Sequence, residues 1–299
     1  TMKKPLFAKI AAALLLIPLA PMGADVLQAP IHLIAAHATP STALSGTVKQ
    51  FTQQAAAPGH RDFNGSIQSP VSWLIAEDQC TEVYDAHGKK LFYGSHPTLR
   101  PANGASAQLS RALDTWNKSM EKSFEMSSAP VLDTINEAQR SGQEVFGAPY
   151  FDMVTISAWG RVDKQMISFF LDGASYSGGA HPISTAGAVN LDAATGREIA
   201  LDEIVVGREE LLTALIDAFR TQYPGREKET YENSIDAQLE QIHPIGEGLT
   251  GFTWYMGDRG ELIVHYPAYT LAPYASGSFT ITVTRTDAPR LFTDAYPMK

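Results

Sequence analysis

The sequence predicts an α+β fold in which antiparallel sheets pack with helices and form two tightly associated halves. Two patterns support this prediction. In several short stretches apolar and polar residues alternate, as in half-buried strands, and in others apolar residues recur every three or four positions, as on one face of a helix. The predicted helices lie between groups of strands and do not follow every strand, which favours antiparallel pairing.

Residues 1–24 are typical of a secretory signal peptide. Three lysines precede an apolar run over 10–17, and the small residues Gly23 and Ala24 follow it, which is the order that a signal peptidase recognises. A retained membrane anchor is the alternative, but spanning about 30 Å of hydrocarbon takes a helix of roughly 20 residues. We therefore expect a secreted, periplasmic or cell-surface protein with no stable membrane span after the signal is cleaved.

The chain beyond the signal peptide divides by composition. Residues 25–66 are rich in Ala, Pro, Thr, Ser and Gln without a sustained period, so we expect a flexible leader there. The folded body is predicted to consist of an N-terminal half over 67–164 and a C-terminal half over 165–285. A tail over 286–299 is predicted to follow it.

The N-terminal half contains strand and helix patterns in turn. A strand is predicted near 71–75, and two short strands within 83–93 are predicted to turn at Gly88, because glycine accepts positive φ. A single apolar stripe predicts a helix over 106–124. A second helical piece is predicted over 131–140, since a glycine that commonly ends helices follows it.

The C-terminal half is predicted to begin with a hairpin and to close with three strands. The second hairpin strand is apolar on both faces, through Ile167, Phe169 and Leu171, so we expect it to be central in its sheet. The predicted ranges are 154–158 and 166–170 for the hairpin, 184–190 for the next strand, 192–196 for a turn, 211–223 and 235–242 for two helices, and 252–256, 262–266 and 279–284 for the closing strands.

The charge balance excludes several classes of partner. The whole chain has a formal net charge of −9, and cleavage after residue 24 removes three lysines and no acid, which leaves −12. Nucleic acids and anionic membranes would be repelled by such a surface, whereas a cationic partner would be attracted. The single cysteine, Cys80, excludes an internal disulfide, and the eight histidines form no closely spaced pair. We therefore expect no cofactor and no metal ion.

Several motifs follow one another in the second half. These are Tyr176-Ser177-Gly178-Gly179-Ala180-His181-Pro182, Asn190-Leu191-Asp192, Thr195-Gly196-Arg197, Leu201-Asp202-Glu203-Ile204, Tyr266-Pro267-Ala268-Tyr269 and Ala272-Pro273-Tyr274. In this order they resemble an extracytoplasmic domain of unknown function that is shared by RsiV-type anti-sigma factors and the non-catalytic part of PdaC-type peptidoglycan deacetylases. The resemblance covers about 165–285 and is weaker over 67–164.

The resemblance implies an extracytoplasmic α+β body and, in the RsiV branch, binding of lysozyme at the cell surface. The sequence shows neither a polysaccharide-deacetylase domain nor a cytoplasmic anti-sigma segment. We therefore expect a non-enzymatic binding protein of the cell envelope whose partner is a cationic protein such as lysozyme, or peptidoglycan. A cell-wall hydrolase or esterase and a purely structural envelope module stay as alternatives.

Two groups of residues are candidate binding positions. The first is the turn formed by Tyr176, Gly178, Gly179 and His181. Its two glycines allow unusual backbone angles, so the turn is either a structural bend that His181 secures by a hydrogen bond or a backbone-rich binding edge. No nucleophile-elbow motif surrounds Ser177, and Ser177, His181 and Asp172 have only the residue types of a triad, so we predict no catalytic residue.

The second group consists of Tyr266, Tyr269 and Tyr274. These tyrosines either pack an irregular strand against the core with their hydroxyls at the rim, or stand at the surface as anchors. As anchors they could stack on sugar rings. An acidic series around one predicted helix, Glu227 to Glu240, is either a solvated face or an attraction for a basic protein.

Overall fold

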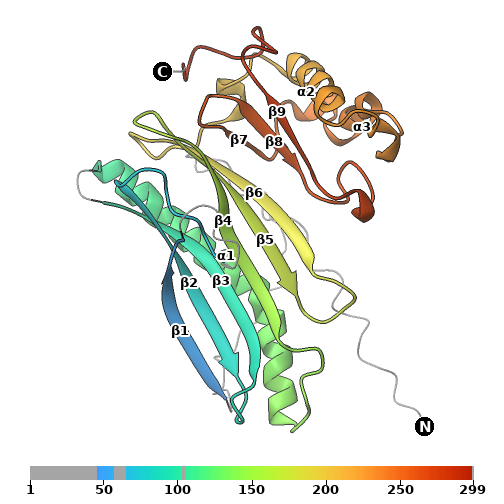
Figure 1. The fold of residues 1–299 in the computed structure, drawn as a ribbon. Coiled ribbons are helices and arrows are strands. Elements are labelled where there is room, and N and C mark those ends of the chain that lie inside the picture. Colours follow the sequence, from blue (N-terminus) through green and yellow to red (C-terminus); the bar gives the residue numbers. More distant parts are fainter. Residues whose placement is uncertain (1–45, 57–64, 103–104, 298–299) are drawn as a thin grey trace.

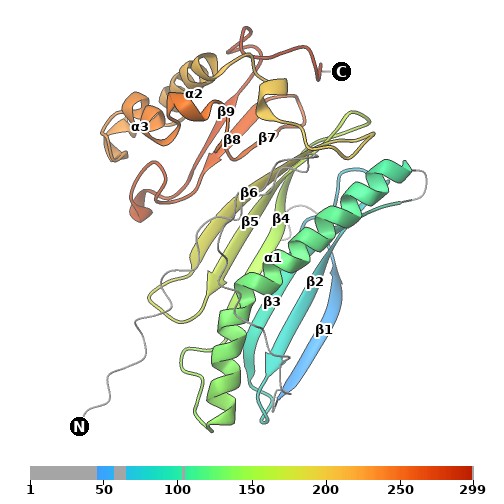
Figure 2. The ribbon, with the colours of Figure 1, turned by 180° about the vertical axis from the view of Figure 1, so that it is seen from behind.

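The computed structural model describes residues 46–56, 65–102 and 105–297, and the predicted signal peptide lies outside these ranges. Figures 1 and 2 show two lobes, a large sheet crossed by one long helix and a smaller sheet covered by two helices. The first lobe contains β1 (Thr47–Gln54), β2 (Leu74–Tyr84), β3 (Lys90–Pro101), α1 (Ala107–Arg140), β4 (Tyr150–Val162), β5 (Met166–Tyr176) and β6 (Ile183–Asp192). The second contains α2 (Arg208–Gln222), α3 (Ile235–Ile242), β7 (Trp254–Met256), β8 (Leu262–Tyr266) and β9 (Phe279–Val283), with short 3-10 turns that include η1 (Leu201–Glu203) and η4 (Tyr274–Ser276).

The predicted α+β class is confirmed. The large sheet has the order β1-β2-β3-β4-β5-β6, and the small one has the order β7-β8-β9. Every neighbouring pair is antiparallel except β3 and β4, which run parallel. The parallel pair exists because α1 carries the chain from the end of β3 back to the start of β4, as a crossover helix does.

The large sheet opens in its middle, between β3 and β4. These strands pair only between Phe92 and Ser95 on one side and the start of β4 on the other. Beyond that point the Asn117 side chain of α1 takes the place of a strand, because its Oδ1 accepts from the Leu99 N–H at 2.8 Å and its Nδ2 donates to the Leu99 carbonyl at 2.9 Å. The free edge of β4 bonds to the segment around Ser66. The Ile156 N–H donates to the Ser66 hydroxyl, and the Ile156 carbonyl accepts from the Ile67 N–H, each at 2.9 Å. Buried backbone groups at the opening therefore keep their partners.

Helix α1 is one continuous helix, although the sequence predicts two pieces over 106–124 and 131–140. Ser106 caps its start, its hydroxyl accepting from the Leu109 N–H at 3.0 Å. Pro130 lies inside the helix and removes one backbone donor. The helix continues past it because the apolar face remains packed, with Ile135 fully buried, and Figure 2 shows it bending as it crosses the sheet.

A strand lies within the segment that the sequence predicts to be a leader. The expected leader, 25–66, includes β1, which pairs along its whole length with β2, from Thr47 opposite Tyr84 to Gln54 opposite Glu77. Nearly every residue of β1 is exposed, so its sequence shows no apolar alternation. Backbone hydrogen bonds to β2 hold this edge strand in the sheet. The predicted boundary at 164/165 falls in the turn between β4 and β5, which are neighbours in one sheet.

The second lobe contains its own core, to which α2, β8 and β9 contribute the fully buried Phe219, Val264 and Phe279. Three of its described residues beyond 285 also belong to this core. Leu291, Phe292 and Tyr296 are buried, so the predicted tail 286–299 is packed against the fold as far as it is described. Within the described ranges, every helix is too short or too polar to cross a bilayer.

Candidate functional site

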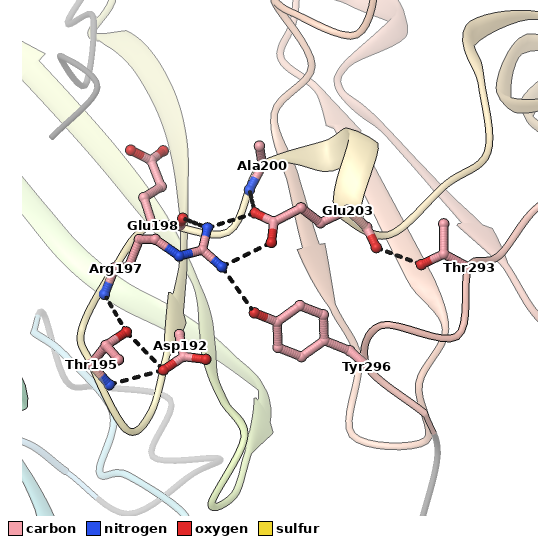
Figure 3. A network of polar contacts seen from close by, with 8 residues as sticks. All are labelled: Asp192, Thr195, Arg197, Glu198, Ala200, Glu203, Thr293 and Tyr296. Atoms are coloured by element: carbon pink, nitrogen blue, oxygen red, sulfur yellow. Dashed lines mark hydrogen bonds and ion pairs between the residues drawn. The ribbon is translucent and has the colours of Figure 1, made fainter. Parts of the chain in front are cut away.

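The motif residues after β6 form a polar junction between the lobes (Figure 3). Asp192 Oδ1 accepts hydrogen bonds from the Thr195 backbone N–H and hydroxyl, each at 2.8 Å, which closes a tight turn. Gly196, with φ of +73°, leads the chain out of that turn. The turn places Arg197 opposite the first residues of the second lobe.

Arg197 and Glu203 form a bidentate ion pair across this junction, in which the two terminal guanidinium nitrogens donate to the two carboxylate oxygens at 2.7 and 2.8 Å. The Arg197 guanidinium lowers the pKa of the Glu203 carboxyl, which also accepts from the Ala200 N–H at 2.9 Å. The Thr293 hydroxyl donates to the Glu203 carbonyl at 2.5 Å, and Figure 3 shows Tyr296 reaching the guanidinium from the same segment. These contacts tie η1 and the C-terminal segment to the large sheet.

A buried clamp lies next to this junction. Ser168 donates to Asn190 Oδ1 at 2.6 Å, and Asn190 Nδ2 donates to the Trp254 carbonyl at 2.8 Å. The Met256 N–H completes the set by donating to the Ser168 hydroxyl at 2.8 Å. The Asn-x-Asp, Thr-Gly-Arg and Leu-x-Asp motifs therefore have structural roles, since they join β5 and β6 to β7 and to the second lobe.

The Gly-Gly turn between β5 and β6 lies on the surface. Gly178 and Gly179 have φ of +89° and +155°, angles that side chains with a Cβ rarely adopt, so glycine is required at both positions. The Tyr176 hydroxyl donates to the Gly179 carbonyl at 3.2 Å. The Tyr176 ring stacks on Phe151, with centroids 5.8 Å apart. Tyr176 thus secures the turn from the sheet side.

Three rings at the end of this turn form a surface that we call the aromatic ledge: His181, Tyr269 and Tyr274. The His181 ring stacks on Tyr274, with centroids 4.9 Å apart and planes 19° apart. The Tyr269 ring also contacts the Tyr274 ring, with centroids 5.5 Å apart. Tyr269 is 57% and Tyr274 48% exposed. The ledge thus brings together residues from both predicted groups and both lobes, at the surface.

The loop that carries the two tyrosines is held in a specific shape. Tyr269 has φ of +71°, a left-handed conformation that is strained for a bulky residue, and its N–H bonds to the Ala272 carbonyl at 3.1 Å. Arg226 donates to the Ser276 carbonyl at 2.7 Å and lies over the Phe279 ring. The fold thus supports an unfavourable backbone angle at a residue whose ring is directed to solvent.

Tyr266 is not part of the ledge, which corrects the sequence prediction for this residue. It is 3% exposed, because the alternation of β8 places it on the inner face with Leu262 and Val264. Its hydroxyl lies 3.2 Å from Nε2 of the buried His243, and burial raises its pKa. The alternation of Leu262, Val264 and Tyr266 in the sequence already indicates this inward position.

The residue types of a triad are not assembled around His181. Nδ1 of His181 lies 2.9 Å from the Pro182 carbonyl, and among the described residues no hydrogen bond joins His181 to Ser177 or Asp172. Nor do three or more potential metal-ligating side chains of His, Cys, Asp and Glu cluster anywhere in the described chain.

The acidic residues divide into a paired and an unpaired set. Arg220 pairs with Glu227 at 2.8 Å and Asp236 at 2.5 Å, and Arg226 pairs with Glu229, so much of the series that the sequence singles out is neutralised. A cleft of about 680 Å³ along α2 is the acidic feature that the sequence prediction missed. Its charged lining consists of Glu209, Glu210, Asp217, Asp287 and Arg290.

The fold and the ledge define a two-lobed α+β protein with its candidate contact site on a surface loop. Residues 204–286, which include α2 to β9, match the family model described as protein of unknown function (DUF3298). The matched span begins inside the region of the sequence resemblance and ends next to its last residue.

The comparison with solved structures also found proteins of the DUF3298 family. A member of the DUF3298 family from Bacteroides fragilis is 14% identical and aligns over 85% of this chain and 96% of its own, with a TM-score of 0.54. A DUF3298 family protein from Pseudomonas aeruginosa is 12% identical, with coverage of 85% and 97% and a TM-score of 0.45. No curated protein matches this chain. At such low identity, the first likeness shows a shared fold.

Proposed function

We propose that this chain is an exported, non-enzymatic binding protein of the cell envelope, and that the aromatic ledge contacts its partner. Peptidoglycan is the first candidate partner. The supporting observation is the exposure of the ledge, where Tyr269 and Tyr274 present about half of their surface to solvent while their rings contact one another at a tilt of 32°. Large, rigid aromatic side chains of this kind lose little conformational entropy on binding, which makes them effective contact residues.

The strain at Tyr269 supports the same proposal. A tyrosine at φ of +71° lowers the stability of the fold, whereas a glycine at this position would not. Observed strain at an exposed residue motivates a functional explanation, and a contact surface supplies one. The neighbouring Gly-Gly turn adds a stretch of exposed backbone beside the rings.

A cationic cell-wall-active protein such as lysozyme is the second candidate partner. The cleft along α2 favours it, because four carboxylates and one arginine line it, and the mature chain is expected to carry −12. Such a surface speeds the encounter with a basic protein. The resemblance to RsiV-type domains points in the same direction. Attraction of this type weakens as salt rises.

Retention assays test the function and separate the two partners. Wild-type protein and a Tyr269→Ala/Tyr274→Ala double variant are incubated with insoluble peptidoglycan and, separately, with immobilised lysozyme at low and moderate salt. Tyr231→Ala is the matched control, because Tyr231 is 47% exposed and lies outside the ledge. We expect ledge-dependent retention on peptidoglycan that persists at moderate salt. If neither material retains the wild-type protein at either salt concentration, the proposed function is wrong.

The hydrolase or esterase alternative has its own test. The protein is incubated with peptidoglycan, and soluble fragments and released acetate are measured, with His181→Ala as the comparison. We expect no product from either protein. Product formation that His181→Ala abolishes without unfolding the chain would replace the binding function by a catalytic one.

A further inference from the structure

The ledge has a shape that limits what it can recognise. Tyr274 is in ring contact with both His181 and Tyr269, so the three rings form one small aromatic cluster at the surface. The residues beside it in the turn, Ser177 to Ala180, have little or no side chain and are polar or small. A stable protein–protein contact buries about 800 Å² on each partner around an apolar centre. The ledge is a narrow platform bordered by bare backbone.

The bare backbone next to the rings offers hydrogen-bond donors. Gly178 and Gly179 are exposed, and among the described residues no hydrogen bond uses their N–H groups. The Gly179 carbonyl already accepts a hydrogen bond from the Tyr176 hydroxyl. The groups of this turn that remain available to a ligand are therefore the two N–H donors. The positive φ angles at both glycines maintain this presentation. A polymeric ligand that extends from the rings over the turn would therefore meet N–H donors there.

Flat rings with adjacent donors suit a flat, uncharged ligand that carries acceptor groups. A hexopyranose ring has an apolar C–H face that packs on an aromatic ring, and oxygen substituents at its edge that accept from N–H groups. The expected charge of −12 disfavours an anionic polymer. We propose that the aromatic ledge binds uncharged hexopyranose units of a polysaccharide, with Tyr269 as the outer stacking ring for one unit and the Gly178–Gly179 backbone as the donor edge for a unit further along the same polysaccharide chain. This inference rests on the proposed function and names the part of the cell wall that is recognised.

Titration calorimetry with a soluble β-1,4-linked N-acetylglucosamine tetramer tests the inference without the intact wall. The variants are Tyr269→Ala, Tyr269→Phe and, as a control of similar exposure, Tyr231→Ala. Loss of one stacking ring is expected to weaken binding roughly tenfold, which corresponds to about 1.4 kcal/mol. Tyr269→Phe keeps the ring and is expected to stay within about twofold of wild type, and Tyr231→Ala to bind as wild type does. A thermal melt of each variant confirms that it is folded.

The outcomes separate this inference from the function on which it rests. If the wild-type protein retains peptidoglycan through the ledge but does not bind the tetramer, the sugar inference is overturned and the binding function stands. Equal tetramer binding by wild type and Tyr269→Ala also overturns it. If the tetramer binds in a Tyr269-dependent way while neither intact peptidoglycan nor lysozyme is retained, the sugar site stands and the envelope function falls.

Discussion

His243 provides a quantitative test of the second lobe. It is 3% exposed, its ring stacks on Phe252 with centroids 3.6 Å apart, and Nε2 lies 3.2 Å from the Tyr266 hydroxyl. Burial, helped by the charge of Arg208, lowers its pKa from 6.5 to about 4. The folded protein therefore keeps His243 neutral at pH values where the unfolded chain binds a proton.

The magnitude and the sign follow from this shift. Because the folded pKa is depressed, the stabilisation is fully present above pH 6.5 and is lost as the pH falls toward 4. One pKa unit corresponds to about 1.4 kcal/mol, so the loss over this window is about 3 kcal/mol. Other titrating groups add their own pH dependence, so the quantity to measure is the difference between wild type and a variant that lacks only this histidine.

The assay is urea unfolding of wild type and His243→Gln, followed by tryptophan fluorescence at pH 7, 6, 5 and 4. We expect the stability difference, wild type minus variant, to fall by about 3 kcal/mol between pH 7 and pH 4. Tyr266→Phe is the control, because it removes the hydroxyl partner and keeps the buried imidazole, so most of the pH dependence should persist. A wild-type-minus-variant difference that stays constant across this pH range would refute the reasoning.

Three further predictions concern the rest of the fold. Tyr269→Gly should raise the unfolding free energy by about 1 kcal/mol by relieving the positive φ, while peptidoglycan retention falls; lower stability would contradict the strain argument. Asn117→Ala should destabilise by about 2 kcal/mol in urea, since two backbone groups of Leu99 lose their partner, and an unchanged midpoint would show that water replaces the amide. Asn190→Ala, which breaks a buried clamp, should lower the melting temperature more than Arg197→Ala, which removes a half-exposed pair worth about 1 kcal/mol or less; the reverse order would be evidence against the clamp.

Most of the secondary structure could be predicted from local patterns. The turn at Gly88, the hairpin around residue 163, α2, α3 and the three closing strands all lie where alternation or a helical stripe indicates them. Each of these elements buries one face, so its apolar residues recur at the period of a strand or a helix and can be recognised in the sequence. Strand β1 has no buried face, and its role as an edge strand depends on a partner that lies about 30 residues further along the chain.

The site was predictable in composition but not in assembly. Residue types alone identify the Gly-Gly turn and the tyrosine group as unusual. That His181 stacks on Tyr274 depends on how the second lobe sits against β6, and no local pattern encodes a contact between positions 93 residues apart. The clamp has the same origin: a motif marks Asn190, but no local pattern indicates that it bonds to the Ser168 hydroxyl and the Trp254 carbonyl.

The ledge takes one ring from the first lobe and two from the second, which has a mechanical consequence. A ligand that bridges His181 and the tyrosines resists separation of the lobes, so part of its binding free energy opposes their opening. The polar junction at Arg197 and Glu203 secures another part of the interface (Figure 3). Pulling the two lobes apart in a force experiment should therefore require more force when the ledge is occupied.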